Sequence, residues 1–436
     1  MENQDIKRGV DLQTRFGEGV TALAGSFKWW KGEKFNKKTL FFLVVIFFLN
    51  LIIVFPLFGK DIVSAYASSE SLALVAQLLS NFALPQRIFF SLLTIGALSL
   101  APVSFYLFVR RIAMRHELTA FLATLFFILP NPFFANVPIL VNALMHGDGA
   151  HVVVFAFIPL FLLYVQAFMK TGNPMLAVFC SFGTAIIAII SPFAAFNLVL
   201  LYTIICISEG FLGDFRLKFM RLGFLFFTGA ALSFFWYYPN VIGQIVLMEH
   251  VQTALARFFS IAPLAIPLLP IMGVVSFLIF DRRERLKPIF ISLWLFLLYL
   301  SLFAVSSNLN IRGIFTSERY LIELSFASSF FLAIVFVLVT ELVLRNFLSA
   351  FKKRAAVFIL LSIGTMVITF LALQGSLIVR SYAQEGIITD PYNVGIGNLH
   401  RVIDFRDVPS VIAFVISFAT LVVLLFSLHS LRSKLK

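Results

Sequence analysis

The sequence has little charge and little cysteine for its length. Only 13% of its 436 residues are charged, whereas 60% are hydrophobic. A chain with so little polar surface cannot coat a water-soluble globule. Its two cysteines, Cys180 and Cys206, fall inside long apolar runs and give no case for a disulfide. The composition therefore excludes a soluble domain and a disulfide scaffold, and it predicts a protein solvated by lipid.

Motifs of soluble enzymes are also missing. The sequence contains no Gly-rich phosphate loop with its Lys, no Gly-x-Ser-x-Gly and no His-Glu-x-x-His. Its start lacks the pattern of a basic segment, a short apolar core and a cleavage site, so we expect no removable signal peptide. The net charge of +13 by itself would suggest nucleic-acid binding, but the distribution of the basic residues does not. Because the basic residues cluster in short loops between apolar runs, we expect a lipid bilayer as partner and no nucleic acid.

The apolar runs are long and continuous, and they are rich in the 55 Phe residues of the chain. A lipid-exposed backbone must satisfy its own hydrogen bonds, so each run is a spanning helix or part of a closed barrel. Barrel strands alternate apolar and polar residues, which these runs do not. We therefore predict an all-α, polytopic bundle of about twelve helices. The runs are 39–58, 88–109, 118–134, 151–168, 175–190, 193–208, 220–238, 262–280, 288–305, 320–343, 355–376 and 408–428.

The distribution of Lys and Arg predicts the orientation of these helices. Alternate loops carry most of the basic residues, which places them and both termini in the cytoplasm. The short runs 175–190 and 193–208 meet at Ser191-Pro192, which we interpret as a turn at the outer face. Three parts follow: a basic cytoplasmic segment 1–38, a transmembrane core 39–343 and a C-terminal helical pair 344–436 with the outer loop 377–407.

The outer loops are the longest connections, at about 59–87, 135–150, 239–261, 306–319 and 377–407. Long loops in compact proteins are often functional. Within the first, residues 69–84 place apolar side chains at spacings of three and four, which predicts an amphipathic helix on the outer surface. We therefore expect the functional site in a cavity on this side.

Ionisable side chains are rare inside the predicted helices and gather at their outer ends. Glu323 lies about one turn into its helix, and this scarcity argues against a proton-coupled transporter. The outer candidates are few, and each has two interpretations. Asp61 is either a catalytic residue or a solvated loop residue without a function. Further candidates for substrate binding are Glu70, His146, Asp148, His151, Glu318, Arg319 and Tyr320.

The segment His146-Gly147-Asp148-Gly149-Ala150-His151 allows two hypotheses. His146, Asp148 and His151 are suitable ligands for a divalent metal ion, the one cofactor that the sequence suggests. The two glycines instead favour a tight turn before a helix, with Asp148 as its cap. Glu318 and Arg319 are likewise either an ion pair at the rim or a phosphate-binding element.

Several segments together resemble the GT-C superfamily of multi-spanning glycosyltransferases, in particular its bacterial and archaeal membrane proteins. Asp61 matches the acidic residue of the first outer loop in that family. The other matching segments occur in the family's order along residues 39–343. They are Phe127 to Phe133, Gly147 to Pro159, Ile190-Ser191-Pro192, Ser233 to Pro239 and Ser317-Glu318-Arg319-Tyr320.

The resemblance implies a prokaryotic cytoplasmic-membrane enzyme that transfers a sugar from a polyprenyl-phosphate donor to a glycan, lipid or protein acceptor outside. It implies that Asp61 is the general base and that Arg319 neutralises the departing phosphate. The chain departs from the family pattern because Glu70 is the only second acid near Asp61 and because it has no large outer soluble domain. A lipid or solute transporter and a non-catalytic scaffold with a membrane-protein partner are the alternatives.

Overall fold

The computed structural model describes residues 37–57, 62–66, 69–82, 84–114, 116–130, 138–247, 249–280, 283–309, 315–346, 364, 366–381 and 408–433. In these residues the chain is all helical and contains no strand. The basic segment 1–36 and most of the loop 377–407 lie outside the described residues, so the predictions made for them remain predictions.

Helices occupy most of each predicted apolar run in the described chain. The run 355–376 falls partly outside it, and from Met366 onward this run belongs to the helix Met366–Ser381. The runs 39–58 and 118–134 also end outside the described residues. The main helices are α2 (Lys37–Val54), α4 (Gln86–Ile112), α5 (Glu117–Ile128), α7 (Gly149–Thr171), α8 (Pro174–Ile190), α9 (Pro192–Gly210), α10 (Phe215–Ser233), α12 (Glu249–Phe280), α13 (Lys287–Asn308), α14 (Leu321–Asn346) and α16 (Val408–Ser433).

Seven segments of the described chain are long and apolar enough to cross a membrane, which confirms the prediction of a helical membrane protein. They are Lys37–Leu57, Gln86–Ile112, Gly149–Thr171, Pro192–Gly210, Glu284–Asn308, Ser317–Glu341 and Val408–Ser427. The helices α5 and α8 are apolar but shorter. The count of twelve spans stays a prediction.

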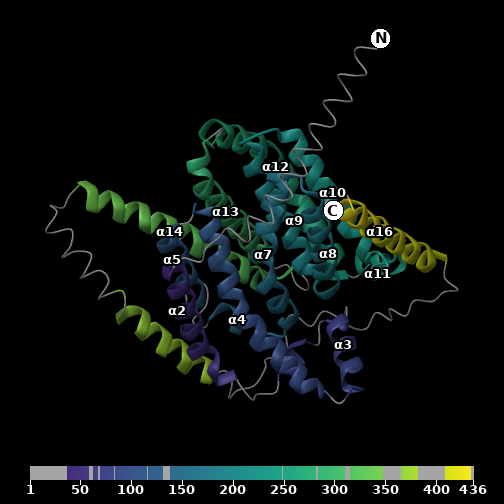
Figure 1. The fold of residues 1–436 in the computed structure, drawn as a ribbon, viewed down its shortest axis with the longest axis horizontal. Coiled ribbons are helices and arrows are strands. Elements are labelled where there is room, and N and C mark those ends of the chain that lie inside the picture. The colour runs from purple at the N-terminus through teal and green to yellow at the C-terminus, as the bar shows by residue number, and fades with distance from the viewer. Residues whose placement is uncertain are drawn as a thin grey trace, which may run out of the picture.

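Helix α7 lies at the centre of the bundle, where α4, α8 and α9 pack against it (Figure 1). It is apolar nearly all round, as expected for a helix surrounded by other helices. Helix α14 packs against α5 and α13, while α2 lies against α4 and α5. Helix α16 lies on one flank against α10, α8 and the short α11 (Pro239–Leu247).

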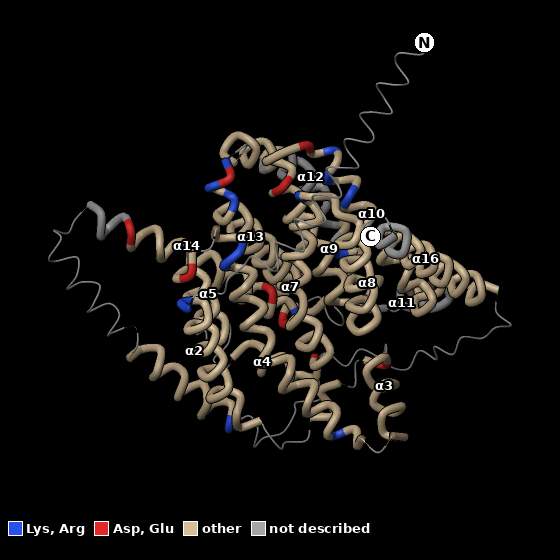
Figure 2. The backbone as a smooth tube through the Cα atoms, in the orientation of Figure 1, with Lys and Arg blue, Asp and Glu red and all other residues tan. Residues whose placement is uncertain are grey.

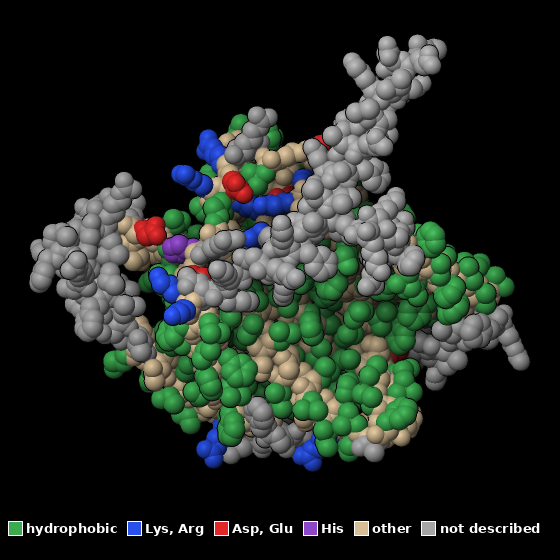
Figure 3. Space-filling view, viewed as in Figure 1, with side chains coloured by type: hydrophobic (Ala, Val, Ile, Leu, Met, Phe, Trp, Pro, Cys, Tyr) green, Lys and Arg blue, Asp and Glu red, His purple; other side chains and the backbone are tan. Residues whose placement is uncertain are grey.

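The outer surface of the bundle is apolar, as Figure 3 shows for the face in view. Phe48 of α2, Phe227 of α10 and Phe426 of α16 all have exposed side chains. Lys and Arg gather instead near the end where α10, α12 and α13 meet, and few lie at the opposite end (Figure 2). An exposed apolar belt with charge confined to its ends is the surface that a bilayer covers.

The predicted amphipathic helix exists as α3 (Glu70–Ser80), and the Ser69 side chain caps its N-terminus by accepting a hydrogen bond from the Leu72 amide. Leu72 and Ala76 face the protein, whereas Val75, Leu78 and the following Phe82 are exposed. The helix packs against α4 and α8. Val75, Leu78 and Phe82 therefore form an apolar surface directed away from the protein, as in a helix at a membrane interface.

The segment 239–261, predicted as an outer loop, is helical in its described residues. Residues Pro239–Leu247 form α11, and α12 begins at Glu249, well before the apolar run at 262. The reason is length: α12 has 32 residues, whereas about 20 residues cross the apolar part of a bilayer. Hydropathy locates the part of a helix that lies in lipid, and this helix continues beyond it.

The turn at Ser191-Pro192 is confirmed. Ser191 has an extended backbone (φ −145°, ψ 106°), which ends α8, and its side chain caps α9 by accepting from the Ala194 amide at 3.3 Å. Pro192 occupies the first position of α9, where its missing N–H costs no hydrogen bond. Two helices, not one kinked helix, therefore connect α7 to α10.

The predicted orientation can be tested by chemical labelling. Arg87 and Arg285 are exposed near opposite ends of the bundle. We expect a membrane-impermeant maleimide to label Arg87→Cys in intact cells and Arg285→Cys only after lysis. The native chain is the control, because Cys180 and Cys206 are buried. Labelling of Arg285→Cys in intact cells would contradict the predicted orientation.

Candidate functional site

The candidate site begins at the tight turn before α7. The helix α6 (Ile139–Met145) ends there, and Gly147 follows with φ +80°, a conformation that glycine adopts without strain. Asp148 then occupies the N-cap position of α7, but its side chain makes no capping hydrogen bond. The turn is as predicted, and the Asp148 carboxylate is directed elsewhere.

Asp148 forms a bidentate ion pair with Arg319. The Arg319 Nε donates to Oδ2 at 3.0 Å, and Nη2 donates to Oδ1 at 2.7 Å. Arg319 lies in the short 3-10 helix η5 (Ser317–Tyr320) that leads into α14, and its guanidinium lies 4.6 Å from the Phe193 ring centre. Both side chains are buried, so this parallel geometry satisfies charges that water does not reach.

His151 lies one turn further along α7 and is flanked by two carboxylates. Its Nδ1 is 3.2 Å from Asp148 Oδ2, and its Nε2 is 2.7 Å from Glu323 Oε1. His151 and Glu323 have no exposed surface at all. The imidazole therefore links the start of α7 to the first turn of α14.

Asn197 of α9 completes the arrangement. Its Nδ2 donates to Glu323 Oε1 at 2.8 Å, and its main-chain oxygen accepts from the Tyr299 hydroxyl of α13 at 3.5 Å. We refer to Asp148, His151, Asn197, Arg319 and Glu323 as the buried polar cluster. Its members come from α7, α9 and the η5–α14 segment, so it holds together helices that are distant in sequence.

The segment after Asp61 covers one side of this region. Residues Val63–Tyr66 form the 3-10 helix η2, which packs on the start of α7. Gly149 makes this approach possible, because a Cβ there would lie 2.9 Å from the Ala65 carbonyl oxygen. The Tyr66 hydroxyl contacts Thr94 Oγ1 of α4 at 2.5 Å, and Ser69 donates to the Ile190 carbonyl of α8 at 3.0 Å. The described parts of the first loop are thus anchored to α4, α7 and α8.

The predicted site residues fall into three groups. Asp61 lies outside the described residues, although the next residue, Ile62, is buried. Asp148, His151, Arg319 and Tyr320 come together, and the Tyr320 ring packs on Phe193 at 5.1 Å. The remaining candidates lie apart from the cluster: Glu70 is the first residue of α3, His146 bonds the Asn142 carbonyl at 2.8 Å, and Glu318 is exposed.

The described residues do not support the metal hypothesis. They hold no group of three or more His, Cys, Asp and Glu side chains placed to bind a metal ion. His151 faces a carboxylate at each nitrogen and Asp148 is paired with Arg319, so neither presents lone pairs to a shared point with His146. The sequence spacing was suitable, but Arg319 of η5 and Glu323 of α14 occupy the ligand atoms.

Three residues of this region were not predicted from the sequence as members of a site. They are Asn197, Glu323 and Phe193. Glu323 carried a signal, because a carboxylate inside a membrane helix usually has a function and a partner. Asn197 and Phe193 carried none beyond their nearness to Ser191-Pro192, since nothing in sequence places α9 beside α14.

The ion pair determines the charge state of Asp148, which immediately precedes the α7 span. Burial acts to raise the pKa of its carboxyl, but the Arg319 guanidinium and the His151 imidazole outweigh burial and hold the pKa well below its usual value. Asp148 is therefore ionised under physiological conditions. It serves as a fixed negative charge, not as an acid.

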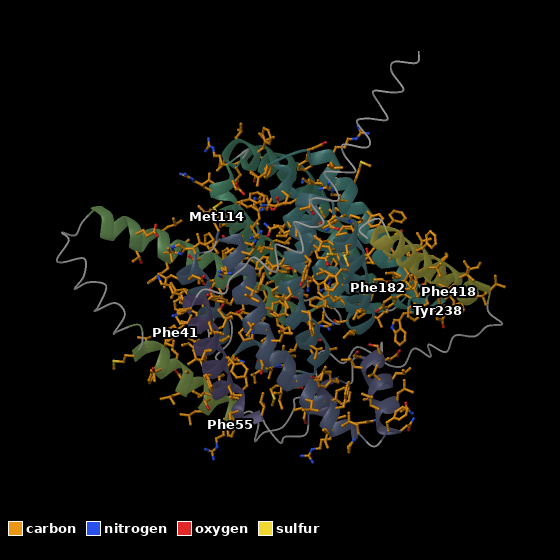
Figure 4. All side chains as sticks on the ribbon, in the orientation of Figure 1. Phe41, Phe55, Met114, Phe182, Tyr238 and Phe418 are labelled. Atoms are coloured by element: carbon orange, nitrogen blue, oxygen red, sulfur yellow. The ribbon has the colours of Figure 1, made fainter. Side chains whose placement is uncertain are left out.

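A separate apolar groove opens on the flank of the bundle between α8, α10 and α16. Its volume is about 260 Å³. Phe182 and Phe418 adjoin it from α8 and α16 (Figure 4). The other lining residues are almost all apolar: Ala185, Ile186, Ile189, Leu232, Phe235, Phe414, Ser417 and Leu421. An apolar groove on a membrane-facing surface suits a hydrocarbon chain.

The comparisons with known proteins gave no match. No protein-family model, no curated protein and no solved structure matches the chain.

The contribution of the ion pair to stability can be measured directly. Asp148→Asn leaves the buried Arg319 charge without its partner, which we expect to cost about 3–5 kcal/mol of unfolding free energy. The measurement is the unfolding midpoint in detergent. Glu284→Gln is the control, because it removes an exposed contact to Lys170 at 3.7 Å. Equal midpoints for the two variants would contradict a structural role for Asp148.

The same pair predicts a pH dependence of stability. The folded pKa of Asp148 lies below its unfolded value of about 3.9, so its contribution is fully present above that pH and is lost as the pH falls through the folded pKa. The measurement is the unfolding midpoint in detergent as a function of pH. We expect the midpoint of the native chain to fall at acid pH for this reason, and this part of the fall should be absent in Asp148→Asn.

Proposed function

We propose that the protein is a membrane glycosyltransferase that transfers a sugar from a polyprenyl-phosphate donor to an acceptor on the outer face. One observation supports this most: the segment directly after Asp61 is fixed on the start of α7, beside the buried polar cluster. A loop whose described part, residues 62–66, packs on the start of α7 suits a reaction in which the preceding carboxylate must be positioned against an acceptor hydroxyl.

In this proposal Asp61 is the general base. A carboxylate can accept the proton of the acceptor hydroxyl as that oxygen attacks the sugar, and an inverting displacement of this kind needs no covalent intermediate. The sugar–phosphate bond breaks and the new glycosidic bond forms, so the leaving group carries its charge away as a lipid phosphate. Asp61 is the residue to which we assign catalysis.

Arg319 has a more limited part than the resemblance implies. Two of its nitrogens are bonded to Asp148, and the pair as a whole has no net charge. The carboxylate weakens the attraction that the guanidinium would exert on a departing phosphate. We therefore assign Arg319 to positioning the start of α14 and the wall of the site.

The apolar groove between α8, α10 and α16 is our candidate for the donor's hydrocarbon chain. It lies on a flank of the bundle whose side chains are apolar, and only Ser417 among its lining residues is polar. The Ser417 hydroxyl donates to the Ala231 carbonyl at 2.7 Å, which removes its need for water. A chain of isoprene units would bury apolar surface there without desolvating a polar group.

The decisive experiment is turnover of polyprenyl-phosphate sugars by the purified protein in lipid. We expect the native chain to consume a donor from a broad panel and Asp61→Asn to lower kcat by about 10²–10⁴-fold, because the variant loses its base. Donor binding should persist in the variant. Glu284→Gln, at an exposed position near the opposite end of the bundle, should keep full activity. Absence of binding and of turnover across the panel would exclude the proposal.

The groove assignment has its own test. Ile186 is an exposed lining residue of α8, and Ile186→Trp should fill part of the groove and raise the KM for donors with long chains about tenfold. Phe179→Trp is the matched control, because Phe179 is exposed on the same helix but does not line the groove. An equal KM for both variants would place the hydrocarbon chain elsewhere.

A proton-coupled transporter is the second candidate, and the contact between His151 and Glu323 favours it. The sequence placed Glu323 near a helix end and argued against this class, whereas the structure shows the carboxylate fully buried against an imidazole. Such pairs inside membrane helices occur in proton pathways. Uptake of a solute by proteoliposomes, driven by a pH gradient, would support this candidate, and inactivity in both assays would favour a scaffold.

A further inference from the structure

The hydrogen-bond geometry of His151 requires an extra proton. Both of its ring nitrogens contact carboxylate oxygens, Nδ1 with Asp148 at 3.2 Å and Nε2 with Glu323 at 2.7 Å. An ionised carboxylate only accepts hydrogen bonds, and a neutral imidazole has a single N–H to donate. Both contacts are therefore satisfied only if His151 is an imidazolium or if one carboxyl is protonated.

The charge balance of the cluster leads to the same requirement. Asp148 and Glu323 contribute two negative charges and Arg319 contributes one positive charge, all in buried side chains. An unbalanced charge in such an environment is costly. One proton on the pair of His151 and Glu323 brings the sum to zero. Asn197, Tyr299 and Tyr320, which also lie around Glu323, carry no charge in their ordinary state.

Several polar atoms beside the pair have no hydrogen-bond partner. Among the described residues, Glu323 Oε2, Asn197 Oδ1 and the Tyr320 hydroxyl are buried and have no hydrogen-bond partner. Buried polar atoms of this kind are normally satisfied by ordered water. A water molecule that donates to Glu323 Oε2 would also be placed to pass a proton to it.

We propose that the buried polar cluster is a binding site for a single proton, shared between His151 and Glu323. On binding, water delivers the proton to Glu323 or to the His151 nitrogen that faces it, and no other bond forms or breaks. On release, the proton returns to water by the same route. The site then holds one net negative charge, and one contact between nitrogen and oxygen loses its hydrogen.

The state of this site governs the contact between α7 and α14. His151 belongs to α7 and Glu323 to α14, and their 2.7 Å contact is attractive only while the proton is present. Without it, two lone pairs face each other between fully buried side chains. Proton release therefore weakens the junction of the two helices, whatever reaction the protein performs.

The protonation state can be observed directly by ¹⁵N nuclear magnetic resonance of histidine-labelled protein in lipid. At about pH 7.5, one unit above the ordinary histidine pKa of about 6.5, we expect the His151 signals to report two protonated nitrogens. If the proton instead resides on Glu323, infrared spectroscopy detects it, because a protonated carboxyl has its own C=O band. Either signal supports the shared proton, and a neutral His151 beside an ionised Glu323 would overturn it.

Glu323→Gln supplies the critical variant. It removes the charge that the proton balances, so His151 should become neutral, with its one proton on the nitrogen facing Asp148. Glu341→Gln is the matched control on the same helix, since Glu341 is exposed and pairs with His116 at 3.7 Å. It should leave the His151 signals unchanged. An unaltered imidazolium in Glu323→Gln would show that Glu323 does not share the proton. If that variant fails to fold, the spectra of the native protein decide the question.

Discussion

The contact of Asp148 with Arg319 and His151 organises the centre of this bundle. A charge placed among membrane helices must find its partner on a neighbouring helix, because neither lipid nor water is available to it. Asp148 precedes α7 and Arg319 precedes α14, so their bidentate pair brings the starts of these two helices to one level. His151 and Glu323 repeat the connection one turn deeper. Side-chain contacts thus connect the starts of α7 and α14 at two successive turns.

Polar clusters at other points of the bundle follow the same rule. Glu209 of α9 accepts hydrogen bonds from Gln166 of α7 and Lys287 of α13. Glu117 of α5 accepts from Arg110 and Tyr106 of α4 and from Thr39 of α2. Each of these two carboxylates therefore joins three helical segments. Apolar packing is similar in lipid and in protein, so these polar contacts supply specificity that hydrophobic burial cannot supply within a membrane.

Small residues and turns bring the polar groups to their places. Gly147 makes the sharp turn that presents Asp148, and Gly149 lets the first loop approach the helix to within backbone contact. Ser191-Pro192 ends one helix and starts the next, which places Asn197 in the second turn of α9, at the depth of Glu323. The same glycines and the Ser191-Pro192 turn therefore determine both the packing of the helices and the positions of the polar side chains.

The sequence by itself determined the class of the protein and the positions of most of its helices. Long, continuous apolar runs in lipid form helices, and Pro192 disfavours a helical backbone at the residue before it. It also indicated Asp148, His151 and Arg319, because polar residues at the ends of apolar runs are conspicuous. Their partners were decided only by the tertiary structure. Glu323 and Asn197 lie 172 and 126 residues from the groups they contact, His151 and Glu323 respectively. Periodicity describes which face of a helix is polar, but it does not state which helix that face will meet.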